Sequence, residues 1–243
     1  MRKRIAAVVV TVVSALGGLS AGAASAAPIE VGHIPQCLEL APAAISLDNT
    51  PTQLEVRVLL DGVSSTRGSE VVQTAQRSYG ALGMTLVASF QSVSFSSDTA
   101  EGIIAESKAL FGGVRPAGVD IVYTLTNKDV SGAVAGMADC IGGVAFPEHA
   151  FAMGENFSPD EGGLLGLSGL TNRQLTAKVL SHELGHLLGG HHHYANCAEG
   201  LLDLGEEASP CTLMFNDVGL ASLNFSALNG LVVQGHGQLY ARP

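Results

Sequence analysis

The segment HELGHLLGGHH, residues 182–192, constrains this chain more than any other part of its sequence. Side chains four residues apart lie on the same face of an α-helix, so His182 and His186 can direct their imidazole rings at one metal ion. The two glycines that follow allow the left-handed backbone with which a helix ends and the chain turns. The turn brings back His192 as a third nitrogen ligand. Three protein ligands and one open position are typical of a catalytic zinc site.

Glu183 stands beside the first histidine, where its carboxylate can reach a water molecule on the metal without binding the metal itself. Such a carboxylate can act as a general base. Three consecutive histidines, residues 191–193, leave alternatives for the third ligand: His191 or His193 could bind instead. The run could also be a surface tract that binds metal loosely without catalysis. A surface tract does not explain Glu183 or the helical spacing, and the register of the segment favours His192.

The helix that carries the first two ligands is indicated independently by its own sequence. Thr171 followed by Gln174 forms a capping-box pattern, which marks a helix start. Apolar residues then recur at helical spacing and predict a buried stripe. They are Leu175, Val179, Leu180, Leu184, Leu187 and Leu188. A long, well-anchored helix would hold metal ligands rigidly, as a catalytic site requires.

The N-terminus has the features of a secretory signal peptide. Basic residues 2–4 precede an apolar run over residues 5–19, and Ala-Ser-Ala at residues 24–26 forms an A-x-A cleavage site. We therefore expect residues 1–26 to be removed and the protein to be secreted to the extracellular space. The alternative is an uncleaved membrane anchor. No other apolar stretch approaches the roughly 20 residues that a membrane span needs.

The charge balance disfavours two classes of partner. The chain has 22 acidic and 12 basic residues and a net charge of −10, which becomes −13 when the three basic residues of the signal peptide are removed. An acidic protein is repelled by nucleic-acid backbones and by anionic membrane surfaces, so we expect neither as a partner after cleavage. The oligomeric state and any calcium site are not determined by the sequence, although a monomer is favoured.

Four cysteines remain after export, namely Cys37, Cys140, Cys197 and Cys211. An even number in an oxidising compartment predicts two disulfides, for which three pairings are possible. Cys197 and Cys211 both closely follow the metal-binding segment, so their pairing would close that loop and leave Cys37 with Cys140. Alternatively, Cys37 could bind the metal as a thiolate and hold a zymogen inactive. The Pro- and Ala-rich residues 27–53 would form either a short pro-segment or an extended N-terminal arm.

The remaining chain predicts one α/β catalytic domain over residues 54–243, with no internal repeat. The expected strands are residues 54–61, 84–95, 119–126, 137–146 and 150–155, and the expected helices are residues 68–82, 99–111 and 226–240 besides the metal-binding helix. Alternating strands and helices indicate a mainly parallel sheet with crossover helices.

The spacing HExxHxxGxxH, formed here by His182, Glu183, His186, Gly189 and His192, is that of the metzincin zinc peptidases. Within that clan the chain most resembles the adamalysin/reprolysin-like group, because its order of strands and helices before the zinc helix is the same. The resemblance implies an α+β metzincin-like fold. Such a fold has a twisted, mainly parallel five-stranded sheet with one antiparallel edge strand, a long zinc-binding helix and a small C-terminal subdomain.

Two further segments carry the resemblance. Residues 135–147 resemble the antiparallel edge strand of the family and its following turn, which implies that a peptide substrate binds along this edge by strand addition. Residues 210–214 resemble the Met-turn, which would place Met214 beneath the zinc ion as a hydrophobic floor. The chain departs from its relatives at Asn216, where astacins and serralysins have a tyrosine ligand. The proline that often follows the adamalysin Met-turn is also absent.

The resemblance implies a zinc-dependent endopeptidase in which one catalytic Zn²⁺ is held by three histidines and Glu183 is the general base, and the signal peptide predicts that it is secreted. Its partner would be a peptide or protein substrate. One alternative is a secreted zinc-binding effector or binding protein with vestigial peptidase activity, and another is hydrolysis of a non-peptide amide. Glu183 argues against a vestigial site, because a structural zinc needs no base and tends to recruit a fourth protein ligand.

Overall fold

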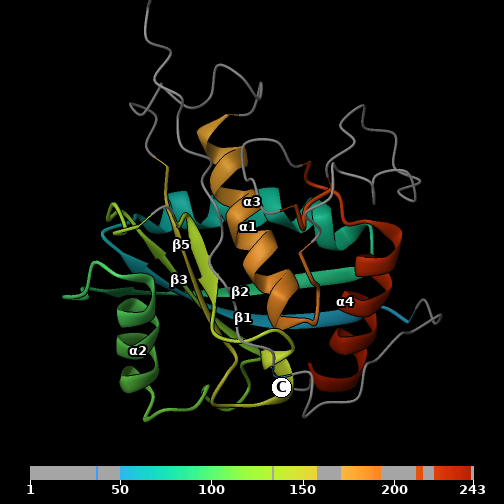
Figure 1. The fold of residues 1–243 in the computed structure, drawn as a ribbon, viewed down its shortest axis with the longest axis horizontal. Helices are drawn as coiled ribbons and strands as arrows, with labels where there is room; N and C mark the ends of the chain where they lie inside the picture. Colours follow the sequence, from blue (N-terminus) through green and yellow to red (C-terminus); the bar gives the residue numbers. More distant parts are fainter. Residues whose placement is uncertain are drawn as a thin grey trace, which may run out of the picture.

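A five-stranded sheet forms the centre of the fold, with helices on both of its faces (Figure 1). The computed structural model describes Cys37 and residues 50–132, 134–157, 171–192, 212–215 and 222–241. The strands are β1 (Thr52–Asp61), β2 (Met84–Val93), β3 (Ile121–Thr126), β4 (Gly136–Ala138) and β5 (Phe151–Glu155). The helices are α1 (Ser65–Gly80), α2 (Ala100–Leu110), α3 (Asn172–Leu187) and α4 (Ala227–Tyr240), with a short 3₁₀ helix, η1 (Gly143–Ala145). The predicted signal peptide lies outside the described residues.

The strands lie in the order β2-β1-β3-β5-β4, and only β4 runs antiparallel to its neighbour, β5. The chain moves outward from β1 to β2 through α1 and then returns past β1 to β3 through α2. Because parallel crossovers are right-handed, two crossovers in opposite directions place their helices on opposite faces of the sheet. The predicted fold class, a mainly parallel five-stranded sheet with one antiparallel edge strand, is confirmed.

Two apolar cores lie on the two faces of the sheet, as the alternation of side chains along β1 requires. Val58 and Leu60 belong to the larger core, which α1, α3 and α4 cover, whereas Leu59 belongs to the smaller core beneath α2. Helix α1 turns four apolar residues into this core, and all of them are buried: Val71, Val72, Ala75 and Tyr79. The larger core therefore supports the helix that carries the predicted metal ligands.

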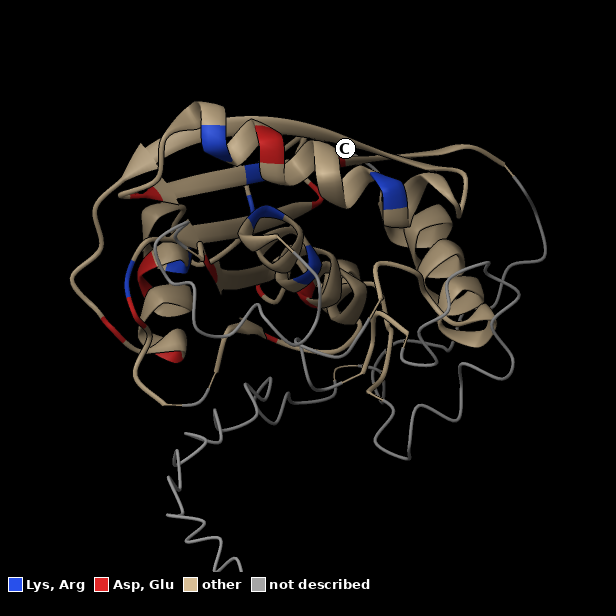
Figure 2. Cartoon of the chain, turned by 90° about the horizontal axis from the view of Figure 1, so that it is seen from above, with Lys and Arg blue, Asp and Glu red and all other residues tan. Residues whose placement is uncertain are grey.

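Helix α4 closes the larger core beside α3 (Figure 1). Its residue Val233 is fully buried in that core, and the helix carries no Lys, Arg, Asp or Glu (Figure 2). Among the described residues, no helix combines the length and the apolar composition that crossing a membrane would need. The charged residues of α1 and α2 are of both signs, so neither helix presents a face of one charge.

The edge strand is shorter than the sequence predicts, and it lies earlier in the chain. We expected an extended piece over residues 137–146, but β4 ends at Ala138 and residues 143–145 form η1. Gly142, at the N-terminus of η1, has a φ of 81°, a left-handed conformation that ends an extended chain. The Gly142 N–H donates a hydrogen bond to the carbonyl of His186 (2.8 Å), so this turn pairs with α3 and not with the sheet.

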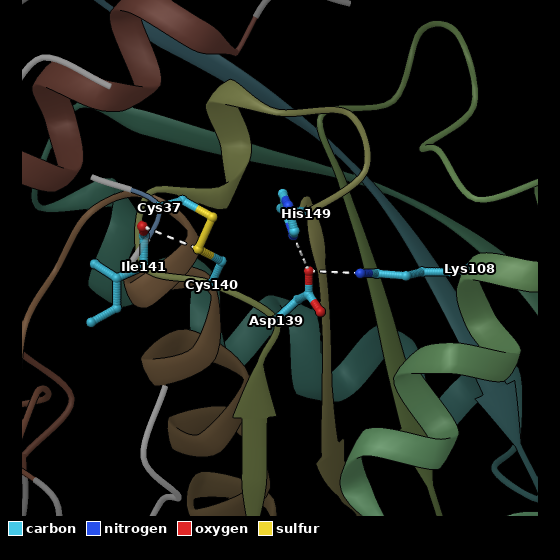
Figure 3. Close-up of a disulfide and its surroundings, with 6 residues drawn as sticks. All are labelled: Cys37, Lys108, Asp139, Cys140, Ile141 and His149. Carbon is cyan, nitrogen blue, oxygen red and sulfur yellow. Dashed lines mark hydrogen bonds and ion pairs between the residues drawn. A yellow bond between two sulfur atoms is a disulfide. The ribbon is translucent and has the colours of Figure 1, made fainter. Parts of the chain in front are cut away.

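A disulfide between Cys37 and Cys140 attaches the chain at Cys37 to the segment that follows β4 (Figure 3). The Cys37 N–H also donates to the carbonyl of Ile141 (3.0 Å). This pairing is the one predicted for Cys37, and it leaves the Cys37 sulfur unable to bind a metal as a thiolate. The other predicted disulfide, Cys197–Cys211, lies outside the described residues. Release of residues 27–53 would therefore require reduction of the disulfide as well as cleavage of the chain.

Asp139 bonds the segment between β4 and β5 to two other residues. Its carboxylate oxygen Oδ2 accepts from Lys108 Nζ of α2 (2.7 Å) and lies 2.6 Å from His149 Nδ1 (Figure 3). The chain between β4 and β5 is thus bonded to α2 through Lys108, to His149 near its own C-terminal end and, through the disulfide, to Cys37. These bonds hold the sheet edge that faces the metal-binding helix.

Candidate metal centre

Helix α3 presents the first two histidines and is anchored along its length. The capping box is present: Thr171 Oγ1 accepts from the Gln174 N–H (3.3 Å), and Gln174 Oε1 accepts from the Thr171 N–H (2.9 Å). All six residues of the predicted apolar stripe are buried, from Leu175 to Leu188. Each buried Leu or Val side chain contributes about 1.5–3 kcal/mol, so packing fixes this helix far more firmly than its cap does.

The structure brings the three predicted ligands together. His182 and His186 lie one turn apart on α3, and His192 returns from the loop that follows the helix. The three Nε2 atoms are each 2.9 Å from the other two. The left-handed conformation needed for this return occurs at Gly189, whose φ is 88°. A side chain there would also come within 3.0 Å of the His236 ring.

Backbone carbonyls orient the two helical histidines. His182 Nδ1 donates to the carbonyl of Leu213 (2.8 Å), and His186 Nδ1 donates to the carbonyl of Gly190 (2.7 Å). A proton on Nδ1 leaves Nε2 with a lone pair for a metal, and such outer partners fix the orientation of a metal-binding imidazole. Burial lowers the pKa of His186 well below its usual value, and the neighbouring His182 and His192 lower it further. Both effects favour the neutral imidazole, which is the form that binds a metal.

The donor set fits one zinc ion. His182 and His186 carry their protons on Nδ1, so no hydrogen lies between their Nε2 atoms. The two Nε2 lone pairs at 2.9 Å therefore repel each other unless a cation lies close to both. Zinc binds imidazole nitrogen at about 2.0–2.1 Å, a distance at which one ion contacts three nitrogens spaced this closely. The three-histidine group is the only candidate metal cluster within the described part of the chain.

The residues after the loop form the predicted floor beneath α3. The Phe215 N–H donates to the carbonyl of Thr212 (3.0 Å), which closes a tight turn containing Met214. Met214 is fully buried, and its sulfur occupies the space beside Gly185, where a Cβ would lie only 2.8 Å away. Gly185 thus allows the methionine to approach the helix between the two ligands. Asn216, where the related tyrosine ligand is missing, lies outside the described residues.

Glu183 points from α3 toward the edge strand β4. Its side chain is fully buried, and neither carboxylate oxygen makes a hydrogen bond of normal geometry within the described residues. A Cβ on Gly136 of β4 would lie 2.8 Å from Glu183 Oε1, so the absence of a side chain at this position makes room for the carboxylate. Burial raises the pKa of Glu183 well above its usual value, and the backbone N–H of Ala138 opposes this in part.

Of the three consecutive histidines, only His192 joins the other two ligands among the residues described here. His191 is exposed, and its backbone is held by Asn229 of α4. His193 lies outside the described residues. The structure therefore agrees with the register that favoured His192.

Three features of this site could not be predicted from the sequence. They are the carbonyl of Leu213 as partner of His182, the space that Gly136 leaves for Glu183, and the bonds between Asn229 and His191. Gly136 and Asn229 are visible in the sequence, but neither has a spacing that relates it to the histidine segment. A backbone carbonyl is present at every residue, so its direction has no sequence pattern.

With this geometry in place, comparison with known proteins is decisive. The family model described as metallo-peptidase family M12B, reprolysin-like, matches residues 67–193, more than half of the chain. The chain belongs to this family. The match ends just beyond His192, so it contains the zinc helix and all three histidines. The predicted relationship to the metzincin zinc peptidases is confirmed.

The fold comparison agrees. The crystal structure of archaemetzincin from Methanopyrus kandleri is similar to this chain with a TM-score of 0.51 and 17% sequence identity. The similarity covers 79% of this chain and 99% of that one, and at this identity it shows a shared fold. A search of curated proteins found no significant sequence match. Family, fold and donor set together identify a zinc metallopeptidase with one catalytic zinc site.

Proposed function

We propose that the protein is a secreted zinc endopeptidase in which Glu183 is the general base. The observation that carries the proposal is the position of Glu183, which follows the ligand His182 on α3 and points at the edge strand. Glu183 directly follows a ligand in the chain, but its carboxylate is not one of the three nitrogen donors. Purely structural zinc sites tend to have four protein ligands, whereas catalytic sites keep one position open.

Zinc and Glu183 would have different roles in the reaction. When bound, zinc supplies Lewis acidity, which lowers the pKa of water and polarises a carbonyl group. The Glu183 carboxylate accepts a proton from the attacking water and later donates it to the leaving amine. The burial of Glu183 excludes bulk water, so the proton passes between the carboxylate and the reacting groups.

Strand β4 supplies a binding edge for an extended substrate. The carbonyl of Ala135 and the N–H of Asp139 bond to β5, so the backbone groups of Gly136 and Ala138 point to the other side in an antiparallel pair. In the described part of the chain no strand pairs with this side of β4, and extended peptides add to such sheet edges through main-chain hydrogen bonds. A substrate strand here would run beside Glu183, which supports a peptide as the substrate.

Secretion is supported by the signal-like residues 1–26 and by the disulfide at Cys37, since disulfides persist in oxidising compartments. The same disulfide supports an N-terminal arm that stays attached to the mature enzyme. We therefore propose that residues 27–53 are retained and not released as a pro-segment.

The test compares the wild-type mature protein with Glu183→Gln, which keeps the size of the side chain but cannot accept the proton. Peptides with blocked termini are incubated with each zinc-loaded protein, and the cleavage sites are mapped by mass spectrometry. We expect internal cleavage by the wild type and a loss of at least about 100-fold in kcat for the variant, since general bases contribute about 10²–10⁴-fold. Zinc stoichiometry, measured by elemental analysis, should stay at one.

Glu70→Gln is the matched control, because this glutamate on α1 has a side chain that is 45% exposed. It should cleave like the wild type. Phenanthroline should abolish cleavage and added zinc should restore it. Full turnover by Glu183→Gln would exclude Glu183 as the base, and cleavage that resists the chelator would exclude zinc from the reaction.

A further inference from the structure

Helix α4 reaches the loop of the third ligand through one side chain. Asn229 Oδ1 accepts from the His191 N–H (3.0 Å), and Asn229 Nδ2 donates to the His191 carbonyl (3.1 Å). Both main-chain groups of a single residue are therefore held by one amide. Because His192 follows directly, the bond to the His191 carbonyl sets the plane of the peptide group that joins the two histidines.

Asn229 is itself held in a defined position. The residue is only 6% exposed, and its own N–H donates to Oγ of Ser226, the residue that caps the start of α4. A planar amide that makes two hydrogen bonds to the backbone of one residue fixes the orientation of that backbone as well as its distance. A buried amide that loses its partners costs stability, so these two bonds are costly to break.

The residues just before α4 also support the first ligand, His182. The carbonyl of Asn224 accepts from the Leu213 N–H (2.7 Å), and the Leu213 carbonyl in turn accepts from His182 Nδ1. Phe225 packs against Gly185 of the zinc helix, and its ring centroid lies 5.5 Å from that of Tyr79. The short segment from Asn224 to Asn229 thus contacts Leu213, the outer partner of His182, and His191, the chain neighbour of His192.

We propose that Asn229 is a positioning residue for the zinc site, which holds His192 in place by clamping the backbone of His191. The proposal rests on the zinc site of the proposed function and adds α4 to it. His182 and His186 are placed by a rigid helix, but His192 lies on a loop after two glycines, so its position needs support from outside α3.

The experiment measures zinc binding in the full mature protein without any substrate. Asn229→Leu has a similar size and removes both bonds, whereas Asn229→Asp keeps the acceptor for the His191 N–H and loses the donor. Val233→Ala is the control, because it weakens the packing of α4 in the core and leaves the clamp intact. Zinc affinity is measured by competition with a chelator, and the cobalt-substituted proteins are compared by their visible d–d spectra.

We expect Asn229→Leu to bind zinc about 10- to 100-fold more weakly, as is typical when an outer-shell partner is lost, and to have an altered cobalt spectrum. Asn229→Asp should fall between this variant and the wild type. Val233→Ala should have a lower Tm with unchanged zinc affinity and spectrum.

Wild-type affinity and spectrum in Asn229→Leu would overturn the proposal, as would equal weakening in Val233→Ala. A wild-type protein that binds no zinc would overturn the proposed function and the clamp together. Zinc binding without peptide cleavage would refute the proposed function, and weaker zinc binding in Asn229→Leu but not in Val233→Ala would still support the clamp.

Discussion

Gly136→Ala tests whether the edge strand sets the position of the general base. A methyl group at this residue would lie 2.5 Å from Val179 Cγ1 and 2.8 Å from Glu183 Oε1. Carbon atoms in ordinary contact are about 3.5–4.0 Å apart, so β4 and α3 must separate by about 1 Å. The three atoms nearest to the added methyl group belong to Val179 and Glu183, so the perturbation acts first on the general base.

The helix has little freedom to avoid the clash. Gly154 faces Gly136 across β4 and β5, and a Cβ there would lie 2.7 Å from the same Val179 methyl group. Val179 therefore lies close above two paired glycines, and a small sideways shift does not release it. Overpacking of a core costs about 1–3 kcal/mol. A displacement of about 1 Å at a reacting group can reduce the rate about 100-fold.

We expect Gly136→Ala to lower kcat/KM about 100-fold while it still binds one zinc ion. Its Tm should fall by several degrees, because 1 kcal/mol shifts the Tm of a domain of this size by about 2–4 °C. The assays are cleavage of a fluorogenic peptide, elemental analysis for zinc and a thermal scan. Gly80→Ala is the control: at the end of α1 its added methyl group would meet only Gln76 Nε2, at 3.4 Å.

Two results would refute this reasoning. Wild-type kcat/KM in Gly136→Ala would show that the strand does not determine where Glu183 lies. Loss of zinc along with activity would show that the clash is transmitted to the ligands, so the rate could no longer be assigned to Glu183. Gly80→Ala should be as active as the wild type and at least as stable.

Two further predictions concern the disulfide and the run of histidines. Cys37→Ser combined with Cys140→Ser should lower the free energy of unfolding by about 2–5 kcal/mol in a guanidinium titration, because the lost bond closes a loop with a sequence separation of 103. An unchanged midpoint and slope would show that the disulfide does not constrain the unfolded chain. His192→Ala should lose stoichiometric zinc, whereas His191→Ala should retain it by elemental analysis. The opposite pattern would exclude the assigned third ligand.

The elements of the fold are largely predictable because their causes are local. The capping box at Thr171 and the apolar spacing from Leu175 to Leu188 are properties of one helix, and both are present in the structure. The edge strand was predicted less well, because the chain after Ala138 turns to bond with α3. An extended sequence pattern does not show which neighbour, sheet or helix, the backbone will contact.

The sequence by itself determined the metal centre and the family. Two histidines one helical turn apart, a glutamate beside the first and glycines before the third specify a local geometry, and local geometry is readable from spacing. Only the tertiary structure decided how that centre is supported. The space at Gly136, the carbonyl of Leu213 and the clamp of Asn229 on His191 bring together residues that are distant in the chain. Such contacts depend on how whole helices and strands pack together, and no periodicity within one of them predicts these contacts.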